Sequence, residues 1–271
     1  MRHTYESAKA FIIRELQDPN AEQIVESYLN PPGQTAPGTR NQLGIEGLFE
    51  RMLISAQNAN MKPAVIGGAI GGIERLGLAL FQYDPQVVTQ LYGGNPDALL
   101  DHIIEVLNPT GQILRTPKSI WPLYCKTILS AASFFEQFED GKDFYSWATH
   151  LYRDPKSAPA LPMIIAAEVD GIGYPLACDF LKDLGFVNYG KPDTHIVEIL
   201  SGIGLCLPQS RPYVIQKTLT KIAVASHVSA YAVDKVFWLI GSGKFYNHKH
   251  LGRNGLIGRK KAKFIAEFNG T

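Results

Sequence analysis

Cysteine is scarce in this chain of 271 residues. The three that occur, Cys125, Cys178 and Cys206, are too far apart for a metal-binding motif or a disulfide framework. Long hydrophobic runs are also missing, since no stretch approaches the ~20 apolar residues that cross a bilayer. The N-terminus starts with an amphipathic pattern and not with an apolar leader. These absences predict a soluble, cytoplasmic protein without a metal site or a membrane partner.

The chain has no large excess of positive or negative charge, because its 26 Lys and Arg residues nearly balance its 25 Asp and Glu residues. The distribution is uneven, however, because no acidic residue occurs between Lys235 and Ala266. The basic residues of this segment are Lys235, Lys244, Lys249, Arg253, Arg259, Lys260, Lys261 and Lys263. Such a segment on a mildly acidic body suggests a face for phosphate groups, but a solvated basic tail explains it equally well.

The alternation of apolar and polar residues that is typical of β-strands is nearly absent. Apolar residues instead recur every three or four positions, as they do in helices. The hydrophobic content of 45% is sufficient for a packed core. Glycine and proline separate the periodic segments. The predicted helices cover residues 5–17, 45–57, 98–107, 119–138, 142–152, 174–184, 194–200, 212–225 and 230–240. The sequence therefore predicts an all-α protein of about ten to twelve short helices.

The most specific local motif is Val169-Asp170-Gly171-Ile172-Gly173, followed by Ala177. One helix should end near Glu168 and the next should begin just after Gly173. The two glycines permit backbone angles that a side chain forbids, and Ile172 should point inward between the helices. Backbone N–H groups and the second helix N-terminus then face one point. This hairpin therefore predicts that a DNA phosphate is bound without recognition of the base sequence.

Further segments resemble one known superfamily. Gly190-Lys191-Pro192-Asp193-Thr194-His195-Ile196 resembles the loop and aspartate of the helix-hairpin-helix-GPD superfamily, and Asp193 lies 22 positions after Gly171. Leu53-Ile54-Ser55-Ala56-Gln57 and residues 233–246 resemble two segments of its endonuclease III branch. Other members are adenine mismatch, 3-methyladenine and 8-oxoguanine glycosylases. The chain is thus identified as a member of this superfamily.

The resemblance implies a fold and a division of the chain. We expect two helical lobes that carry a helix-hairpin-helix motif and have a cleft between them. A central lobe would span residues 38–187. The second lobe would combine residues 1–37 with 188–271 and carry the catalytic loop and the basic C-terminal segment. Asp193 would then lie at the mouth of the cleft.

The resemblance also implies an activity, which is removal of a damaged or modified base from double-stranded DNA by a monomeric enzyme. The base must first leave the stack. Asp193 would be the catalytic carboxylate, although its position before a helix also fits a simple N-cap. Gln57 would fill the gap left by the base. The remaining expected DNA contacts are Gly171, Ile172, Gly173, Lys191 and Lys244.

Departures from the superfamily narrow this expectation. An iron–sulfur cluster needs four closely spaced cysteines, and no cysteine follows Cys206, so we expect no cluster and no other cofactor. Whether the backbone carbonyls of the hairpin bind a monovalent cation is left open. Pro175 occupies the position of the lysine that forms a Schiff base in bifunctional members. The expected enzyme is therefore monofunctional and leaves an abasic site.

Alternatives remain open at this stage. Lys182 or Lys191 could supply an amine for a combined glycosylase and abasic-site lyase. The chain could also be a DNA-binding module without catalysis, or a helical interaction protein whose glycines only turn corners. The base is undetermined: alkylated purines, 8-oxoguanine, mismatched pyrimidines and bulky modified cytosines of the kind phages use all qualify, the last implying a role in phage defence.

Overall fold

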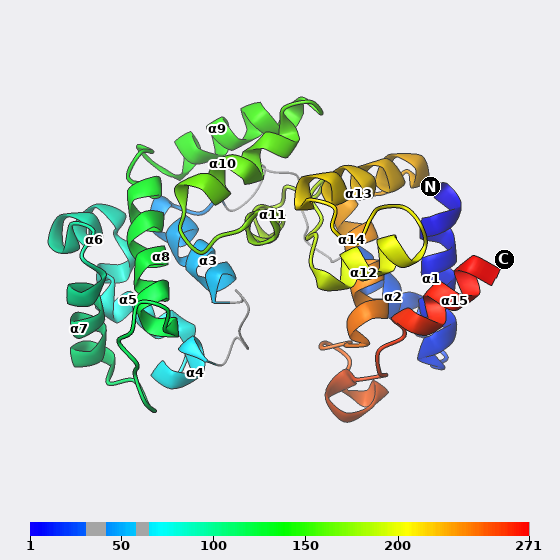
Figure 1. The fold of residues 1–271 in the computed structure, drawn as a ribbon, viewed down its shortest axis with the longest axis horizontal. Coiled ribbons are helices and arrows are strands. Elements are labelled where there is room, and N and C mark those ends of the chain that lie inside the picture. The colour runs from blue at the N-terminus through cyan, green and yellow to red at the C-terminus, as the bar shows by residue number, and fades with distance from the viewer. Residues whose placement is uncertain (31–41, 58–64, 271) are drawn as a thin grey trace. The chain divides into compact units, whose positions relative to one another are not determined.

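The computed structural model describes residues 1–30, 42–57 and 65–270. Over these ranges the chain contains fifteen α-helices and no β-strand, which confirms the predicted all-α class (Figure 1). None of the helices in the described ranges is long and apolar enough to cross a membrane. The chain divides into two compact units, Met1–Ala36 with Leu181–Thr271 and Pro37–Phe180. They are called the terminal unit and the central unit below.

The central unit is built around α8 (Ile120–Phe135), which packs against helices on several sides. Its other helices are α3 (Ile45–Ala56), α4 (Ile66–Ile70), α5 (Leu76–Ala79), α6 (Pro85–Tyr92), α7 (Pro96–Leu107), α9 (Gly141–Arg153), α10 (Leu161–Glu168) and the start of α11 (Tyr174–Asp183). Short 3-10 helices cover Ile73–Arg75, Phe81–Tyr83 and Ala158–Ala160. Aromatic rings of α8 and α9, among them Phe134, Phe135 and Phe144, form the core with Phe180.

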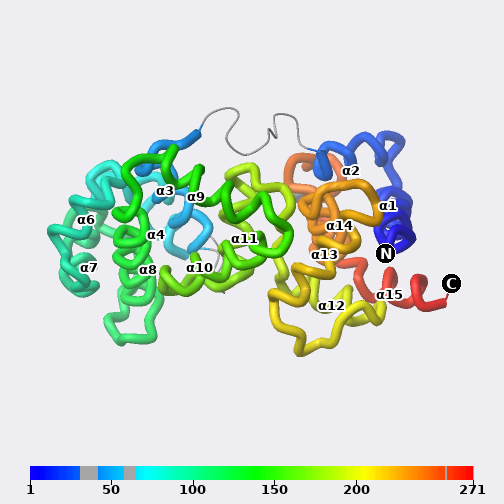
Figure 2. The backbone as a smooth tube through the Cα atoms, turned by 90° about the horizontal axis from the view of Figure 1, so that it is seen from above, coloured from blue at the N-terminus to red at the C-terminus, as the bar shows by residue number. Residues whose placement is uncertain are grey.

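The terminal unit is built around α14 (Ala230–Ser242), whose apolar side chains are almost all buried. It packs against α1 (Arg2–Leu16), α2 (Ala21–Leu29), α12 (Thr194–Gly202), α13 (Pro212–Ser226) and α15 (Lys261–Gly270). Two 3-10 helices, Lys249–Leu251 and Arg253–Gly255, lie between α14 and α15. The first two helices thus share one core with the last three (Figure 2). Burial of that shared core is the main force that joins the two ends of the sequence.

More helices form than the ten to twelve expected, because several short or weakly patterned ones escaped the periodicity criterion. α6 begins with Asp84 as N-cap, whose side chain accepts hydrogen bonds from Gln86 and Val87 N–H, and with Pro85 in the first turn. α15 buries only Phe264 fully, so its apolar stripe is too narrow to recognise. Caps and tertiary burial decide these helices more than periodicity does.

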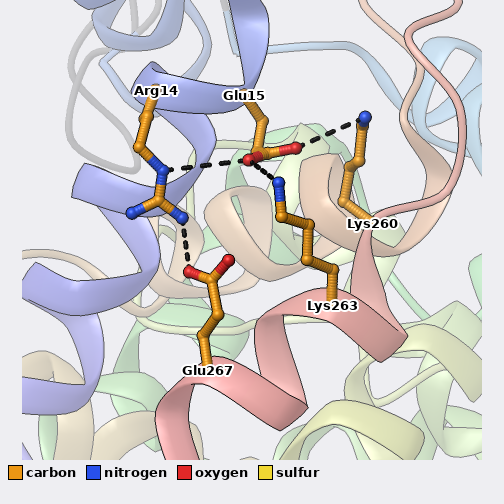
Figure 3. Close-up of polar contacts among 5 residues, drawn as sticks. All are labelled: Arg14, Glu15, Lys260, Lys263 and Glu267. Atoms are coloured by element: carbon orange, nitrogen blue, oxygen red, sulfur yellow. Dashed lines mark hydrogen bonds and ion pairs between the residues drawn. The ribbon is translucent and has the colours of Figure 1, made fainter. Parts of the chain in front are cut away.

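Part of the basic C-terminal segment holds the terminal unit together. The Nζ atoms of Lys260 and Lys263 lie 3.3 and 2.6 Å from the carboxylate of Glu15 on α1 (Figure 3). Lys261 pairs with Glu198 of α12. For these three residues, the expectation of a phosphate-binding face is wrong, because their charges are paired within the protein. Lys263 is exposed despite its pairing, and the other exposed Lys and Arg residues of the segment are Lys244, Lys249, Arg253 and Arg259.

Replacing Glu15 by Gln should lower the free energy of unfolding by about 1 kcal/mol at neutral pH, because a network of ion pairs is lost. Hydrogen bonding to Lys263 and Lys260 lowers the pKa of Glu15. Its contribution is therefore complete above the ordinary glutamate pKa and disappears as pH falls through the lowered value. Urea unfolding across pH measures this. Glu6→Gln, in the exposed Arg2–Glu6 pair of the same helix, should change stability far less.

Candidate functional site

The predicted hairpin is present in the central unit. α10 ends at Glu168, and α11 begins at Tyr174. Gly171 has a φ of +79°, a backbone conformation that side chains disfavour, whereas Ile172 is 2% exposed and Ala177 is fully buried. The local geometry is therefore that of a helix-hairpin-helix motif, with an inward Ile172 between two exposed glycines.

The hairpin is fixed on α8. The backbone N–H of Asp170 donates a hydrogen bond of 2.9 Å to Ser130 Oγ. A Cβ atom on Gly171 would collide with Thr127 Oγ1. Gly173 has no such neighbour, since its Cβ would meet only Pro175 Cδ at 3.7 Å. Packing thus explains the glycine at 171, while the open space at Gly173 leaves its backbone accessible to a ligand.

Gln57, the expected wedge, is buried in the central unit. It ends α3 and is 7% exposed. Its Oε1 atom lies 3.1 Å from the position that a Cβ on Gly67 of α4 would take, so the two residues are packed together. The next residues, 58–64, lie outside the described ranges. Its role in filling the gap behind a flipped base stays a prediction, and in this structure Gln57 does not project.

The loop that precedes α12 is held by side chains of α13 and by the backbone of α14. Gly190 N–H donates to Gln216 Oε1 at 3.1 Å, and Gln216 Nε2 donates to the Asn188 carbonyl at 3.0 Å. Tyr231 N–H donates to the Val187 carbonyl at 2.9 Å. Gln216 is 2% exposed, so its amide satisfies loop groups that would otherwise be buried without partners. The loop therefore has one defined position.

Asp193 is the N-cap of α12. Its Oδ1 accepts a hydrogen bond of 3.2 Å from Ile196 N–H, which shows that the capping role is real. Burial raises the pKa of Asp193, and the nearby Asp234 carboxylate raises it further. The Ile196 hydrogen bond and the charges of His195 and Lys191 oppose this shift. A half-buried carboxylate with a raised pKa at a helix start fits a general base as well as a cap.

Two charged residues beside this loop form a pair that the sequence did not predict, although Lys182 was named there as a possible lyase amine. Lys182 Nζ on α11 donates to Asp234 Oδ2 on α14 at 2.9 Å, and both side chains are buried, at 8% and 3% exposure. The sequence holds only a weak signal, which is a single Asp within the apolar stripe of residues 230–240. The two partners are 52 residues apart, so their pairing is visible only in the fold.

His195 is a packing residue. Its ring lies against α14, where a Cβ on Gly241 would approach within 2.7 Å of the His195 Cβ and 2.8 Å of its ring. Burial lowers the pKa of His195, which favours the neutral imidazole. These contacts indicate a structural role for His195. Lys191 lies half-buried in the Asp193 loop, and Lys244 is exposed just after α14.

The expected site residues therefore fall into two groups. Gly171, Ile172, Gly173 and Gln57 belong to the central unit, and Asp193, Lys191 and Lys244 belong to the terminal unit. Within the terminal unit, the structure brings Asp193 together with Asp234 and, through it, Lys182. The functional roles of these residues stay predictions, and Gln57, the expected wedge, is buried in this structure.

Comparisons with known proteins agree with this geometry. No protein-family profile matches the chain. A curated 8-oxoguanine DNA glycosylase/AP lyase of Korarchaeum cryptofilum (strain OPF8) is 29% identical over 86 residues, which cover 30% of this chain and 41% of that relative. The chain thus matches less than half of the relative's length.

A solved structure provides the likeness in fold. It is the Methanocaldococcus jannaschii 8-oxoguanine glycosylase/lyase in complex with a 15mer DNA containing 8-oxoguanine. The TM-score is 0.54 at 16% sequence identity, over 87% of this chain and 99% of that one. At this level of identity the likeness shows the fold alone, and it is the fold that the hairpin and the Asp193 loop indicate.

Gly190→Ala should destabilise the terminal unit and displace the Asp193 loop. The added Cβ would lie 2.7 Å from Leu219 Cδ1 and 2.9 Å from Asp234 Cβ, both on packed helices. We expect a loss of about 1–3 kcal/mol in the free energy of unfolding, measured in urea. Gly270→Ala is the control, because its Cβ meets no atom within 4 Å. Equal stability of the two variants would contradict the tight loop packing.

Proposed function

We propose that this chain is a DNA glycosylase that removes a damaged base from duplex DNA, with 8-oxoguanine as the first candidate base. The observation that carries the proposal is the half-buried Asp193, capping α12 in a defined loop, in a chain that also has the helix-hairpin-helix. The choice of base is supported by the names of the curated relative and of the solved neighbour, which both refer to 8-oxoguanine.

The proposed reaction is hydrolysis of the N-glycosidic bond. As the bond to the base breaks, its electron pair leaves with the base and positive charge develops on the sugar. The ionised Asp193 stabilises that charge and accepts a proton from the water whose oxygen bonds to the sugar carbon. The raised pKa of Asp193 suits this task, because a stronger base accepts the proton more readily.

In this proposal, DNA is bound by groups that contact its backbone and do not recognise the base sequence. The hairpin backbone at Gly173, whose side is open, and the N-terminus of α11 offer N–H groups and a positive dipole end to one phosphate. Exposed Lys244 and half-buried Lys191 add positive charge in the terminal unit. Binding should therefore weaken steeply with salt concentration.

Asp193→Asn should abolish base release while the protein stays folded. Asn caps helices as well as Asp does, so only the charge and the basicity are lost, and the single-turnover rate should fall by about 10²–10⁴. Released base is measured by mass spectrometry on duplexes that each carry one candidate base, including 8-oxoguanine, alkylated purines and a modified cytosine. Asp84→Asn, which changes an equivalent cap in the central unit, is the control.

The outcomes separate the proposed function from its alternatives. Unchanged release by Asp193→Asn would remove Asp193 from the mechanism. Salt-sensitive DNA binding by the wild type without release of any base would favour a non-catalytic DNA-binding module. Absence of DNA binding would favour a helical interaction protein instead.

Strand scission tests the second half of the proposal, which is that the enzyme is monofunctional. Pro175, in the first turn of α11, has no amine and cannot form a Schiff base with the sugar. The wild type should cut the strand only after alkali and should not be trapped on DNA by borohydride. Pro175→Lys should gain trapping. Scission without alkali would instead support the alternative of an associated lyase, as the names of both relatives include.

A further inference from the structure

The Lys182–Asp234 ion pair is costly for the terminal unit. Both side chains are buried, at 8% and 3% exposure, and the Lys182 Nζ and Asp234 Oδ2 atoms lie 2.9 Å apart. Asp234 Oδ1 is buried and makes no hydrogen bond within the described part of the chain. Apolar residues of similar size are often more stabilising than such a pair. Stability of the fold therefore does not explain why these two charges are here.

The pair lies directly behind the loop that carries Asp193. The Cβ of Asp234 is 2.9 Å from the position that a Cβ on Gly190 would take, so the loop backbone touches the aspartate. Gly190 is three residues before Asp193, and its N–H is fixed by Gln216. Lys182 in turn fixes Asp234 by a hydrogen bond. A negative charge is thus held in one place against the Asp193 loop.

We propose that Asp234, fixed by Lys182, is a positioning residue that places a permanent negative charge beside Asp193 and so makes Asp193 a stronger base. The proposal rests on the proposed glycosylase function for its catalytic meaning. Asp234 acts through Asp193 and not on the substrate. Lys182 holds the Asp234 carboxylate in place by its hydrogen bond.

The other charged and titratable groups around Asp193 do not replace this effect. The Asp234 carboxylate raises the pKa of Asp193 in addition to burial, whereas Lys191 and His195 lower it. Burial raises the pKa of Tyr231 to about 12, so its hydroxyl beside Lys182 is neutral at physiological pH. The groups that face the pair from α11, α14 and the segment after α14 are Asp183, Tyr231 and Tyr246. Asp234 is thus the anion that raises the pKa of Asp193.

The test is the titration of Asp193 in the free protein, followed by carbon NMR of its carboxyl group. Asp234→Asn should shift this titration to lower pH, because a like charge is removed. The acid limb of the rate of base release should shift in the same direction. The rate on the plateau should fall roughly three- to tenfold, since a weaker base accepts the proton less readily.

Two further variants exclude a merely structural effect. Lys182→Met should shift the Asp193 titration in the same direction, because the Asp234 carboxylate is then no longer fixed against the loop. The double variant Lys182→Met/Asp234→Asn leaves no buried unpaired charge, so it should fold even where a single variant does not. Glu15→Gln is the control, because it weakens the terminal unit at a distant ion-pair cluster and should not shift the Asp193 titration.

The outcomes are distinguishable from those for the proposed function. An unchanged Asp193 titration in both Asp234→Asn and the double variant would overturn the inference, whether or not the wild type releases a base. A shifted titration supports the inference even if no base is released, and in that case only the glycosylase proposal fails. Borohydride trapping of the wild type that is lost in Lys182→Met and kept in Asp234→Asn would also overturn it, because Lys182 would then be a nucleophile.

Discussion

The close contact between Gly190 and the helices α13 and α14 is the constraint on which the candidate site depends. With no side chain at this position, the loop backbone reaches Leu219 and Asp234, and its amide reaches Gln216 inside the terminal unit. Asp193 then begins α12 at a fixed place. Because the core around α14 joins the first and last helices of the chain, the site is connected to most of the terminal unit.

Two buried carboxylates of the terminal unit show how surroundings decide what a charge does. Glu15 is bound by Lys260 and Lys263, which lower its pKa, so this carboxylate holds α15 on α1. Asp234 has one cation, and its other oxygen has no hydrogen bond within the described residues. Its effect reaches Asp193 instead, whose pKa it raises. A fully paired carboxylate stabilises the fold, whereas a sparsely paired charge acts on its neighbours.

The sequence predicted those features that are encoded locally. The longer helices follow from apolar periodicity, and the hairpin follows from the spacing of Gly171 and Gly173, because a turn with positive φ needs glycine at that position. Features that depend on distant contacts were missed. Gln57 is buried because α4 places Gly67 on it, and Lys182 meets Asp234 across 52 residues. The pairing of Lys260 and Lys263 with Glu15 likewise needs the first and last helices to meet.

Pro175 and the Lys182–Asp234 pair belong to the same chemical argument. A lysine at position 175 would itself be the nucleophile that attacks the sugar. The Asp193 carboxylate would then need to supply little more than a stabilising charge. With proline at 175 the proposed nucleophile is water, which is a poor nucleophile until a base accepts its proton. The basicity of Asp193 then limits the reaction. In the proposed mechanism, a buried anion beside the carboxylate raises that basicity without contacting the substrate, which would give the energetically costly pair a purpose in catalysis.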